Sequence, residues 1–192
     1  MFSLVKIRKR KNFRKVMLPV VKIRKPKDLK GVQAGKLPQR LLRSIGGSAQ
    51  LHHMAAPAWQ KMVADAKEAG ITLKPSSSAD AYRSYAMQLA AFKQRYVLTD
   101  TGTGQTRRFR GKTWYLKPKM AVLATPGSSN HNWGLAVDVA NANGKTLKWM
   151  LKNEHLYGFS HEVQSEPWHI RLVTGDTPTP LVQAFIDAKV VA

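Results

Sequence analysis

Residues 129–138 read Ser-Asn-His-Asn-Trp-Gly-Leu-Ala-Val-Asp, and residues 166–169 read Glu-Pro-Trp-His. In the first stretch, His131 and Asp138 are seven residues apart, so one straight strand would place them on opposite faces. Gly134 lies between them and allows the chain to bend. We therefore expect His131 on a loop that approaches a strand, and Asp138 on the strand itself.

Asp138 interrupts an apolar run that extends from Leu135 to Ala140. A carboxylate in such a run is expected to be buried, and burial without a partner is costly. Ala136 shares a strand face with Asp138 and is small, which leaves room for an ion. A metal ion is one suitable partner. A core aspartate that pairs with arginine or caps backbone groups is the alternative.

The second stretch places Glu166 three residues before His169, with Pro167 between them. Proline argues against a helix interior, so we expect an extended segment and a strand over residues 167–173. In that conformation Pro167 and His169 share one face and Glu166 lies at the start of the strand. Taken alone, a single histidine is more often a structural residue than a ligand.

Taken together, these residues fit the chemistry of one zinc ion. Two histidines and one carboxylate fill three positions of a tetrahedral site and leave the fourth for water. The metal lowers the pKa of that water and polarises a carbonyl group. Glu166, if it is not a ligand, can act as the general base. Trp168 is expected either to shield this site or to belong to the core.

A third motif, Tyr82-Arg83-Ser84-Tyr85 followed by Gln88, precedes both stretches. We expect residues 81–83 to be extended and Ser84 to cap a helix that continues to about residue 97. Arg83 would then lie at the end of a strand, where it could stabilise an oxyanion or clamp a carboxylate. A structural salt bridge is the alternative role for Arg83.

The combined motifs resemble the signature of the LAS-type zinc peptidases, Ser-x-His-x-x-Gly-x-Ala-x-Asp followed by Glu-x-x-His. This group includes the VanY-like D-alanyl-D-alanine carboxypeptidases and the L-alanyl-D-glutamate endopeptidases of bacteria and phages. The likeness covers about residues 50–175 and includes each fixed position of the first motif, namely Ser129, His131, Gly134, Ala136 and Asp138.

The resemblance implies an α+β fold with a small antiparallel sheet flanked by helices, as in the LAS/Hedgehog-like zinc peptidases. It implies one Zn²⁺ bound by His131, Asp138 and His169, with Glu166 and Arg83 as catalytic residues. The expected substrate is a peptidoglycan stem peptide, and the expected substrate-binding residues are Ser129, Gln88, Tyr85 and Trp168.

Length and pattern predict one catalytic domain, residues 31–192, behind a basic arm, residues 1–30. Further predictions are helices over 56–69 and 146–156, a final helix from Thr179-Pro180, and a strand over 71–73. Residues 99–119 are polar and basic, which predicts a binding loop or hairpin. We expect the tandem pair His52-His53 on the surface.

The chain holds 32 Lys and Arg against 11 Asp and Glu, and residues 1–30 contain 12 of the basic residues and one acidic residue. This arm repeats the sequence Val-Lys-Ile-Arg-Lys at residues 5–9 and 21–25. It is expected to be a solvated tail, or a segment that docks on a virion or another polyanionic partner. Nucleic acid is not expected as the main partner, because only Phe2 and Phe13 could stack on bases.

The composition excludes several other classes of site and location. The absence of cysteine excludes disulfides, thiolate metal sites and cysteine nucleophiles. We find neither an apolar run long enough to span a membrane nor a secretion signal. The protein is therefore expected to reach the cell wall as a phage virion component or a holin-released lysin, with a cytoplasmic enzyme as the alternative.

Three functions remain open from the sequence. The first is a D-alanyl-D-alanine carboxypeptidase, which the form Glu-Pro-Trp-His at residues 166–169 favours slightly. The second is an L-alanyl-D-glutamate endopeptidase with the same metal site. The third is a non-catalytic binding or structural protein that works through its basic arm.

Overall fold

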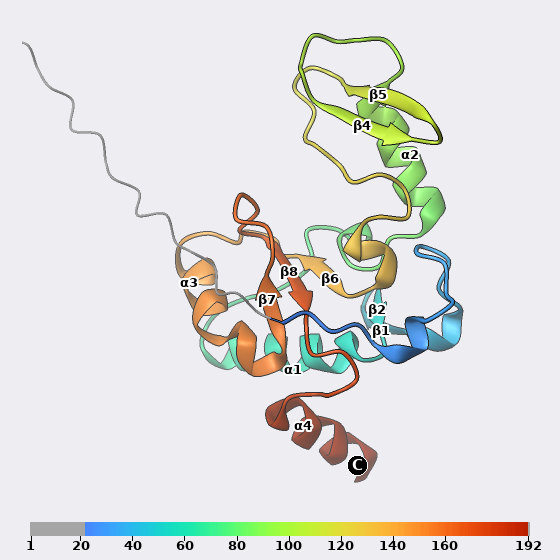
Figure 1. The fold of residues 1–192 in the computed structure, drawn as a ribbon. Helices are drawn as coiled ribbons and strands as arrows, with labels where there is room; N and C mark the ends of the chain where they lie inside the picture. The colour runs from blue at the N-terminus through green and yellow to red at the C-terminus, as the bar shows by residue number, and fades with distance from the viewer. Residues whose placement is uncertain (1–21, 192) are drawn as a thin grey trace, which may run out of the picture.

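Three small antiparallel sheets and four α-helices make up residues 22–191, the part of the chain that the computed structural model describes (Figure 1). This architecture confirms the predicted fold class. The helices are α1 (Ala55–Glu68), α2 (Tyr85–Arg95), α3 (Gly144–Asn153) and α4 (Pro180–Val191). The strands are β1 (Leu42–Gly46), β2 (Ala49–His52), β3 (Tyr96–Val97), β4 (Thr106–Phe109), β5 (Lys112–Leu116), β6 (Ala136–Asp138), β7 (Phe159–His161) and β8 (His169–Leu172). Short 3-10 turns are η1 (Lys27–Leu29), η2 (Gln39–Leu41), η3 (Ser78–Asp80), η4 (Asn130–Trp133) and η5 (Glu154–Tyr157).

Strand β8 is the middle strand of the sheet that positions the candidate site, with β6 on one side and β7 on the other. All four of its residues are buried. Ile170 is paired with Val137 of β6 and with His161 of β7, and it belongs to the main hydrophobic core. Because side chains alternate along a strand, His169 and Arg171 point to the opposite face.

Helix α1 confirms the predicted helix over residues 56–69. Its buried residues recur at helical spacing, with Trp59, Met62 and Ala66 on one face. This face packs into the main core, and α1 contacts β1, β2 and α4. The helix ends beside Gly70, whose φ of 72° is a left-handed conformation that favours glycine.

Helix α2 and the strands β3, β4 and β5 form a projecting unit, residues 85–116, which extends away from the rest of the domain (Figure 1). The unit has an aromatic core of its own, in which Phe92 and Tyr96 stack with ring centroids 4.6 Å apart. Phe109 of β4 packs edge-on against Phe92. Strands β4 and β5 pair antiparallel, so of the loop or hairpin predicted over residues 99–119 the hairpin is confirmed.

Three predicted elements differ from the structure. Residues 71–73 do not form a strand; the chain pairs only later, through an isolated bridge between Pro75 and Val139, the residue just after β6. Proline lacks the N–H that a longer ladder needs, which limits this pairing. The helix predicted over 146–156 is α3 followed by the 3-10 turn η5, and α2 ends before residue 97 because Tyr96 pairs with Leu116 of β5.

The described part of the basic arm packs on the domain. Arg24 donates its backbone N–H to Val173 O (2.8 Å), and Leu29 is buried in the main core. The first copy of the repeat, residues 5–9, lies outside the described residues, as does the start of the second copy. The predicted boundary at residue 30 and the predicted partners of the arm stay predictions.

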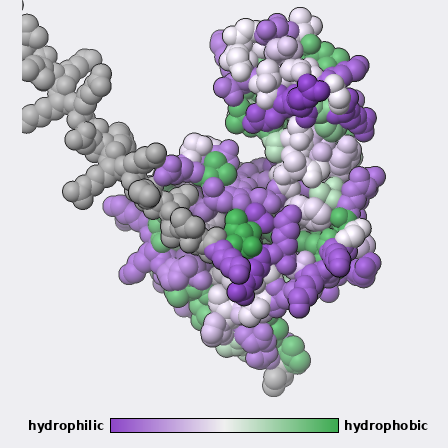
Figure 2. All heavy atoms as spheres, viewed as in Figure 1, coloured by the Kyte–Doolittle hydropathy of each residue, from purple (hydrophilic) through white to green (hydrophobic). Residues whose placement is uncertain are grey.

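The face of the molecule visible in Figure 2 is mostly hydrophilic, in keeping with the formal charge of +21. None of the helices within residues 22–191 combines the length and the apolar character that crossing a bilayer requires.

Gly134 makes the turn that we predicted between His131 and Asp138. Its φ is 63°, and it closes the 3-10 turn η4 just before β6. A Cβ atom at this position would lie only 2.7 Å from the backbone nitrogen of His52. That nitrogen also donates to Gly134 O at 2.9 Å, so the two segments cannot separate without losing this bond.

Replacing Gly134 with alanine should therefore destabilise the fold for two reasons. A left-handed alanine costs about 1–2 kcal/mol, and the backbone clash should add about 1–3 kcal/mol. Gly70→Ala is the matched control, because Gly70 has a similar φ but nothing within 4 Å of its Cβ position. Urea unfolding should show the larger loss for Gly134→Ala; equal losses would contradict the close approach.

Candidate functional site

His131, Asp138 and His169 converge on one face of the central sheet. His131 lies in η4, Asp138 ends β6, and His169 begins β8 directly opposite Asp138 in the strand register. Cross-strand partners project to the same face, so the strand pairing itself brings these two side chains together. His131 Nε2 is 3.2 Å from Asp138 Oδ2, and His169 Nδ1 is 2.7 Å from Asp138 Oδ1. One ligand atom from each of the three residues lies within 4.8 Å of the others.

The outer nitrogen of each histidine faces a hydrogen-bond acceptor. His131 Nδ1 donates to Ala81 O (2.9 Å), and His169 Nε2 is 2.9 Å from Glu162 Oε1. A carbonyl oxygen can only accept, so the proton of a neutral His131 belongs on Nδ1. The lone pair of neutral His131 Nε2 then faces Asp138, whereas both ring nitrogens of His169 face carboxylate oxygens. Outer acceptors that orient two rings in this way are typical of metal-binding histidines.

Glu162 extends this arrangement beyond the three predicted residues. It follows β7, and its Oε2 accepts from Arg171 Nη1 (3.0 Å) while Oε1 accepts from Asn130 Nδ2 (2.6 Å). His169 thus has a carboxylate on each side, Asp138 toward β6 and Glu162 toward β7. Sequence reasoning missed Glu162 and Arg171 because β7 has only three residues and was not predicted. The one sequence signal for β7 was Gly158, a residue that can end a helix, directly before the short strand that ends at His161.

The pKa values follow from this network. Burial alone would raise the pKa of Asp138 and of Glu162, but their hydrogen-bond partners outweigh it. The pKa of Asp138 is held well below its usual range by His131 and His169, and that of Glu162 is lowered to about 2 by His169 and Arg171. Burial disfavours the charged form of His169, yet the two carboxylates raise its pKa to about 9. Asp138 and Glu162 are therefore ionised on this face of the sheet, and two such carboxylates favour a cation between them.

A cavity of about 760 Å³ opens over these three residues. It is also lined by four further residues that the sequence predicted as site residues, Arg83, Ser129, Glu166 and Trp168. Glu166 lies in the loop between β7 and β8, where its carbonyl accepts from His169 N (3.0 Å). Within residues 22–191 its carboxylate has no hydrogen bond or ion pair. Trp168 is 43% exposed, so the core alternative for this tryptophan is wrong.

Arg83 combines the two roles that the sequence left open. Its Nη2 pairs with Asp80 Oδ1 (3.0 Å), its Nε donates to Ala79 O, and its side chain lines the cavity. Nη1 donates to Gln88 Oε1 (3.0 Å), and Gln88 in turn donates to Ala124 O. These bonds hold the guanidinium in one orientation.

Gln88 and Tyr85 are not among the residues that line the cavity, although we predicted both as substrate contacts. Gln88 is fully buried behind Arg83, and its amide is used by Arg83 and Ala124. Tyr85 is half-buried, with its hydroxyl 3.5 Å from Arg110 Nη2. In the structure described, Gln88 orients Arg83 instead of facing the cavity.

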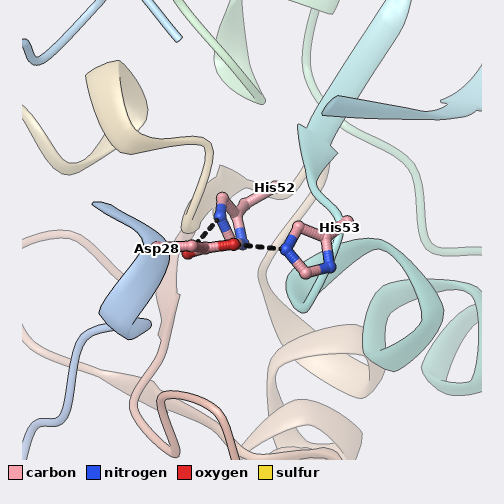
Figure 3. A group of neighbouring side chains, drawn as sticks. All are labelled: Asp28, His52 and His53. Atoms are coloured by element: carbon pink, nitrogen blue, oxygen red, sulfur yellow. Dashed lines mark hydrogen bonds and ion pairs between the residues drawn. The ribbon is translucent and has the colours of Figure 1, made fainter. Parts of the chain in front are cut away.

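A second group, Asp28, His52 and His53, also brings potential ligand atoms together (Figure 3). The expected surface position is wrong for His52, which is fully buried, with its Nε2 3.2 Å from Asp28 Oδ1 of η1. Burial lowers the pKa of His52 to about 4, so its ring is neutral. Met54 N donates to its Nδ1 (3.3 Å), which places the ring proton on Nε2, the nitrogen 3.2 Å from Asp28. This tautomer disfavours a metal and favours an anchor between η1 and β2.

His161 anchors the loop that holds Glu166. Its Nδ1 is 2.8 Å from Glu154 Oε1, and its Nε2 donates to Pro167 O (2.9 Å). Both ring nitrogens therefore face acceptors, an arrangement that only the imidazolium satisfies completely. Burial alone would lower the pKa of His161, but the bonds to Glu154 and Pro167 raise it overall.

The sequence of this chain is similar to known carboxypeptidases. The family model described as VanY, D-alanyl-D-alanine carboxypeptidase, matches residues 48–175, which include every predicted site residue. The chain is 33% identical over 75 residues to a D-alanyl-D-alanine carboxypeptidase of Enterococcus faecalis, across 31% of this chain and 28% of that protein. It is 32% identical over 140 residues to the putative carboxypeptidase YodJ of Bacillus subtilis, across 62% and 45% respectively. It thus spans less than half the length of these relatives.

The fold is similar to that of the LdcB LD-carboxypeptidase. The two structures align with a TM-score of 0.51 and 22% sequence identity, over 81% of this chain and 76% of the other. At 22% identity this likeness concerns the fold alone.

The charged His161 should make stability depend on pH. A raised folded-state pKa means that its contribution is complete below about pH 6.5 and is lost as pH rises through the folded value. His161→Gln should therefore cost about 1.5–3 kcal/mol near pH 6 and less near pH 9, measured by urea unfolding. The exposed His155, changed to Gln, is the control and should show little effect at either pH. A cost for His161→Gln that stays constant across this range would contradict the imidazolium assignment.

Proposed function

This chain belongs to the VanY family of D-alanyl-D-alanine carboxypeptidases, and we propose that it is a zinc-dependent peptidase that removes terminal D-alanine from peptidoglycan stem peptides. The observation that supports this most is the convergence of His131, Asp138 and His169 beneath a cavity that also contains Glu166. Two imidazoles and a carboxylate are a ligand set of hydrolytic zinc sites, which keep a further position open.

The three side chains fit a single zinc ion. His131 would offer Nε2 and His169 Nδ1, because their other ring nitrogens face Ala81 O and Glu162. Asp138 would offer a carboxylate oxygen. When bound there, zinc supplies Lewis acidity and a water of lowered pKa. Glu162, held by Arg171, orients His169 from outside the ligand set.

The remaining cavity residues have distinct proposed roles. Glu166, whose carboxylate has no partner in the described residues, would accept a proton from the attacking water and donate it to the leaving amine. Arg83, fixed by Asp80 and Gln88, would stabilise negative charge on the substrate carbonyl or bind its carboxylate. Ser129 and Trp168 would contact the substrate from the cavity wall.

The size of the cavity keeps a second candidate function open, an L-alanyl-D-glutamate endopeptidase. A volume of about 760 Å³ is in the range that holds a drug-sized ligand, so it can take a longer stretch of stem peptide than one terminal residue. Both reactions would use the same metal ligands and the same base. They differ only in which amide bond lies beside Glu166.

The purified chain should bind one zinc ion. Elemental analysis after dialysis should give one ion per chain for the wild type and for Asp28→Asn, and close to none for His169→Ala. The Asp28 variant is the control for the second histidine group, which the tautomer of His52 makes unsuitable for metal. Circular dichroism should show that both variants stay folded. A second ion that is lost in Asp28→Asn would contradict the single-site assignment.

Glu166→Gln should lower the rate of stem-peptide hydrolysis by about 10²–10⁴-fold without loss of zinc, because the amide cannot accept a proton. Mass spectrometry of a stem pentapeptide should show loss of terminal D-alanine with wild type, and the exposed Glu68→Gln is the matched control. An internal cut with the same dependence on Glu166 would favour the endopeptidase. No cleavage by zinc-loaded wild type would overturn the proposed function.

A further inference from the structure

Two arginines of the projecting unit line the cavity in addition to Arg83. Arg95 is the last residue of α2, and Arg107 lies in β4. Both are half-buried. Neither belongs to the zinc ligand set or to the general-base machinery, so their presence at the cavity needs a separate explanation.

Backbone carbonyls hold both side chains in place. Arg95 Nη1 donates to Ala121 O (3.3 Å), and Arg107 Nε donates to Leu123 O (3.3 Å). Arg107 Nη1 also donates to Thr106 O (2.9 Å). A guanidinium has five N–H donors, so each side chain keeps several donors for another partner. In the described part of the chain, neither arginine is in an ion pair.

The aromatic core of the projecting unit determines where Arg107 points. Strand β4 alternates, with Arg107 and Phe109 half-buried and Arg108 exposed. Because Phe109 packs against Phe92, Arg107 projects to this same inner face. Tyr96 Oη in addition donates to Leu123 O (3.2 Å) and accepts from Leu123 N (3.1 Å). The wall that holds Arg107 is therefore itself fixed.

The other charges of the cavity are already balanced within the protein or assigned a role. Asp80 pairs with Arg83, and Glu162 pairs with Arg171. Asp138 is shared by two histidines. Arg95 and Arg107 are thus cations in a cavity wall without an acidic partner, and such a pair favours an anionic ligand. A planar guanidinium matches a carboxylate especially well, since two parallel hydrogen bonds can form.

We propose that Arg95 and Arg107 form a subsite for a free carboxylate of the stem peptide. This inference rests on the proposed function, because it names the part of that substrate the two arginines bind. A stem peptide offers two such groups, the terminal carboxylate and the α-carboxylate of its D-isoglutamyl residue. Their chemistry is the same, so the experiment must separate them.

Binding can be measured apart from hydrolysis in zinc-loaded Glu166→Gln protein, which leaves the peptide intact. The probes for calorimetry are L-Ala-D-isoglutamyl-L-Lys-D-Ala-D-Ala, its isoglutamine analogue and its C-terminal amide. Adding Arg95→Gln or Arg107→Gln should weaken binding of the first peptide about ten-fold or more. The analogue that lacks the recognised carboxylate should bind weakly to the parent protein, and its affinity should fall little further in the arginine variants.

Matched controls separate a subsite from general charge. Lys93→Gln and Arg108→Gln each remove one positive charge from an exposed position of the same unit and should leave binding unchanged. If Arg108→Gln weakens binding as much as Arg107→Gln, or if both cavity variants bind all three peptides like the parent, the subsite is overturned. If no peptide binds to the parent, the subsite is likewise overturned.

A parallel hydrolysis assay keeps the two proposals distinct. Zinc-loaded wild type that binds the acid peptide through Arg95 and Arg107, yet cleaves no stem peptide, would contradict the proposed function and leave the subsite standing. The subsite alone would be contradicted if wild type cleaved the three peptides equally well and if Arg95→Gln and Arg107→Gln cleaved them at the same rates as wild type.

Discussion

The structure depends on the pairing of Asp138 with His169 across two antiparallel strands. This register places a carboxylate beside one nitrogen of His169, and the chain after β7 places Glu162 beside the other. Three short strands thereby produce a row of alternating charge that no single segment could form. A slip of one residue would turn every side chain of β8 to the opposite face. Ile170 and Leu172 would then leave the main core and point to the face of the candidate site. Core packing and site geometry are therefore set by the same register.

The cavity is built from two parts of the chain that are stabilised separately. The body contributes the row on the sheet, and its loop with Glu166 is held at Pro167 by the buried His161. The projecting unit contributes Arg95 and Arg107, and its Tyr96 holds the adjoining wall at Leu123. Arg83 stands between them, because it is bonded to both η3 and α2. Under the proposed function, each part would hold a different portion of the substrate.

Much of this site was predictable, because its chemistry is concentrated in two short motifs. The bend at Gly134 and the helix after Ser84 follow from local rules about glycine and capping. The extended segment predicted from Pro167 is wrong at its start, because residues 167–168 form a turn in which His169 N donates to Glu166 O, and β8 begins only at His169. Roles that depend on distant partners were not predictable. Gln88 was expected at the substrate but supports Arg83, and His52 was expected at the surface but lies beneath Asp28. Glu162 was missed because a three-residue strand leaves almost no periodic signal.

The separate aromatic core of the projecting unit has a consequence for how the fold tolerates change. Phe92, Tyr96 and Leu116 form a hydrophobic cluster that is separate from the main core. A substitution within this cluster can therefore change the packing of the projecting unit without disturbing the strands that carry the candidate metal ligands. The wall of the cavity at Arg95 and Arg107 can in this way be altered separately from the sheet beneath it.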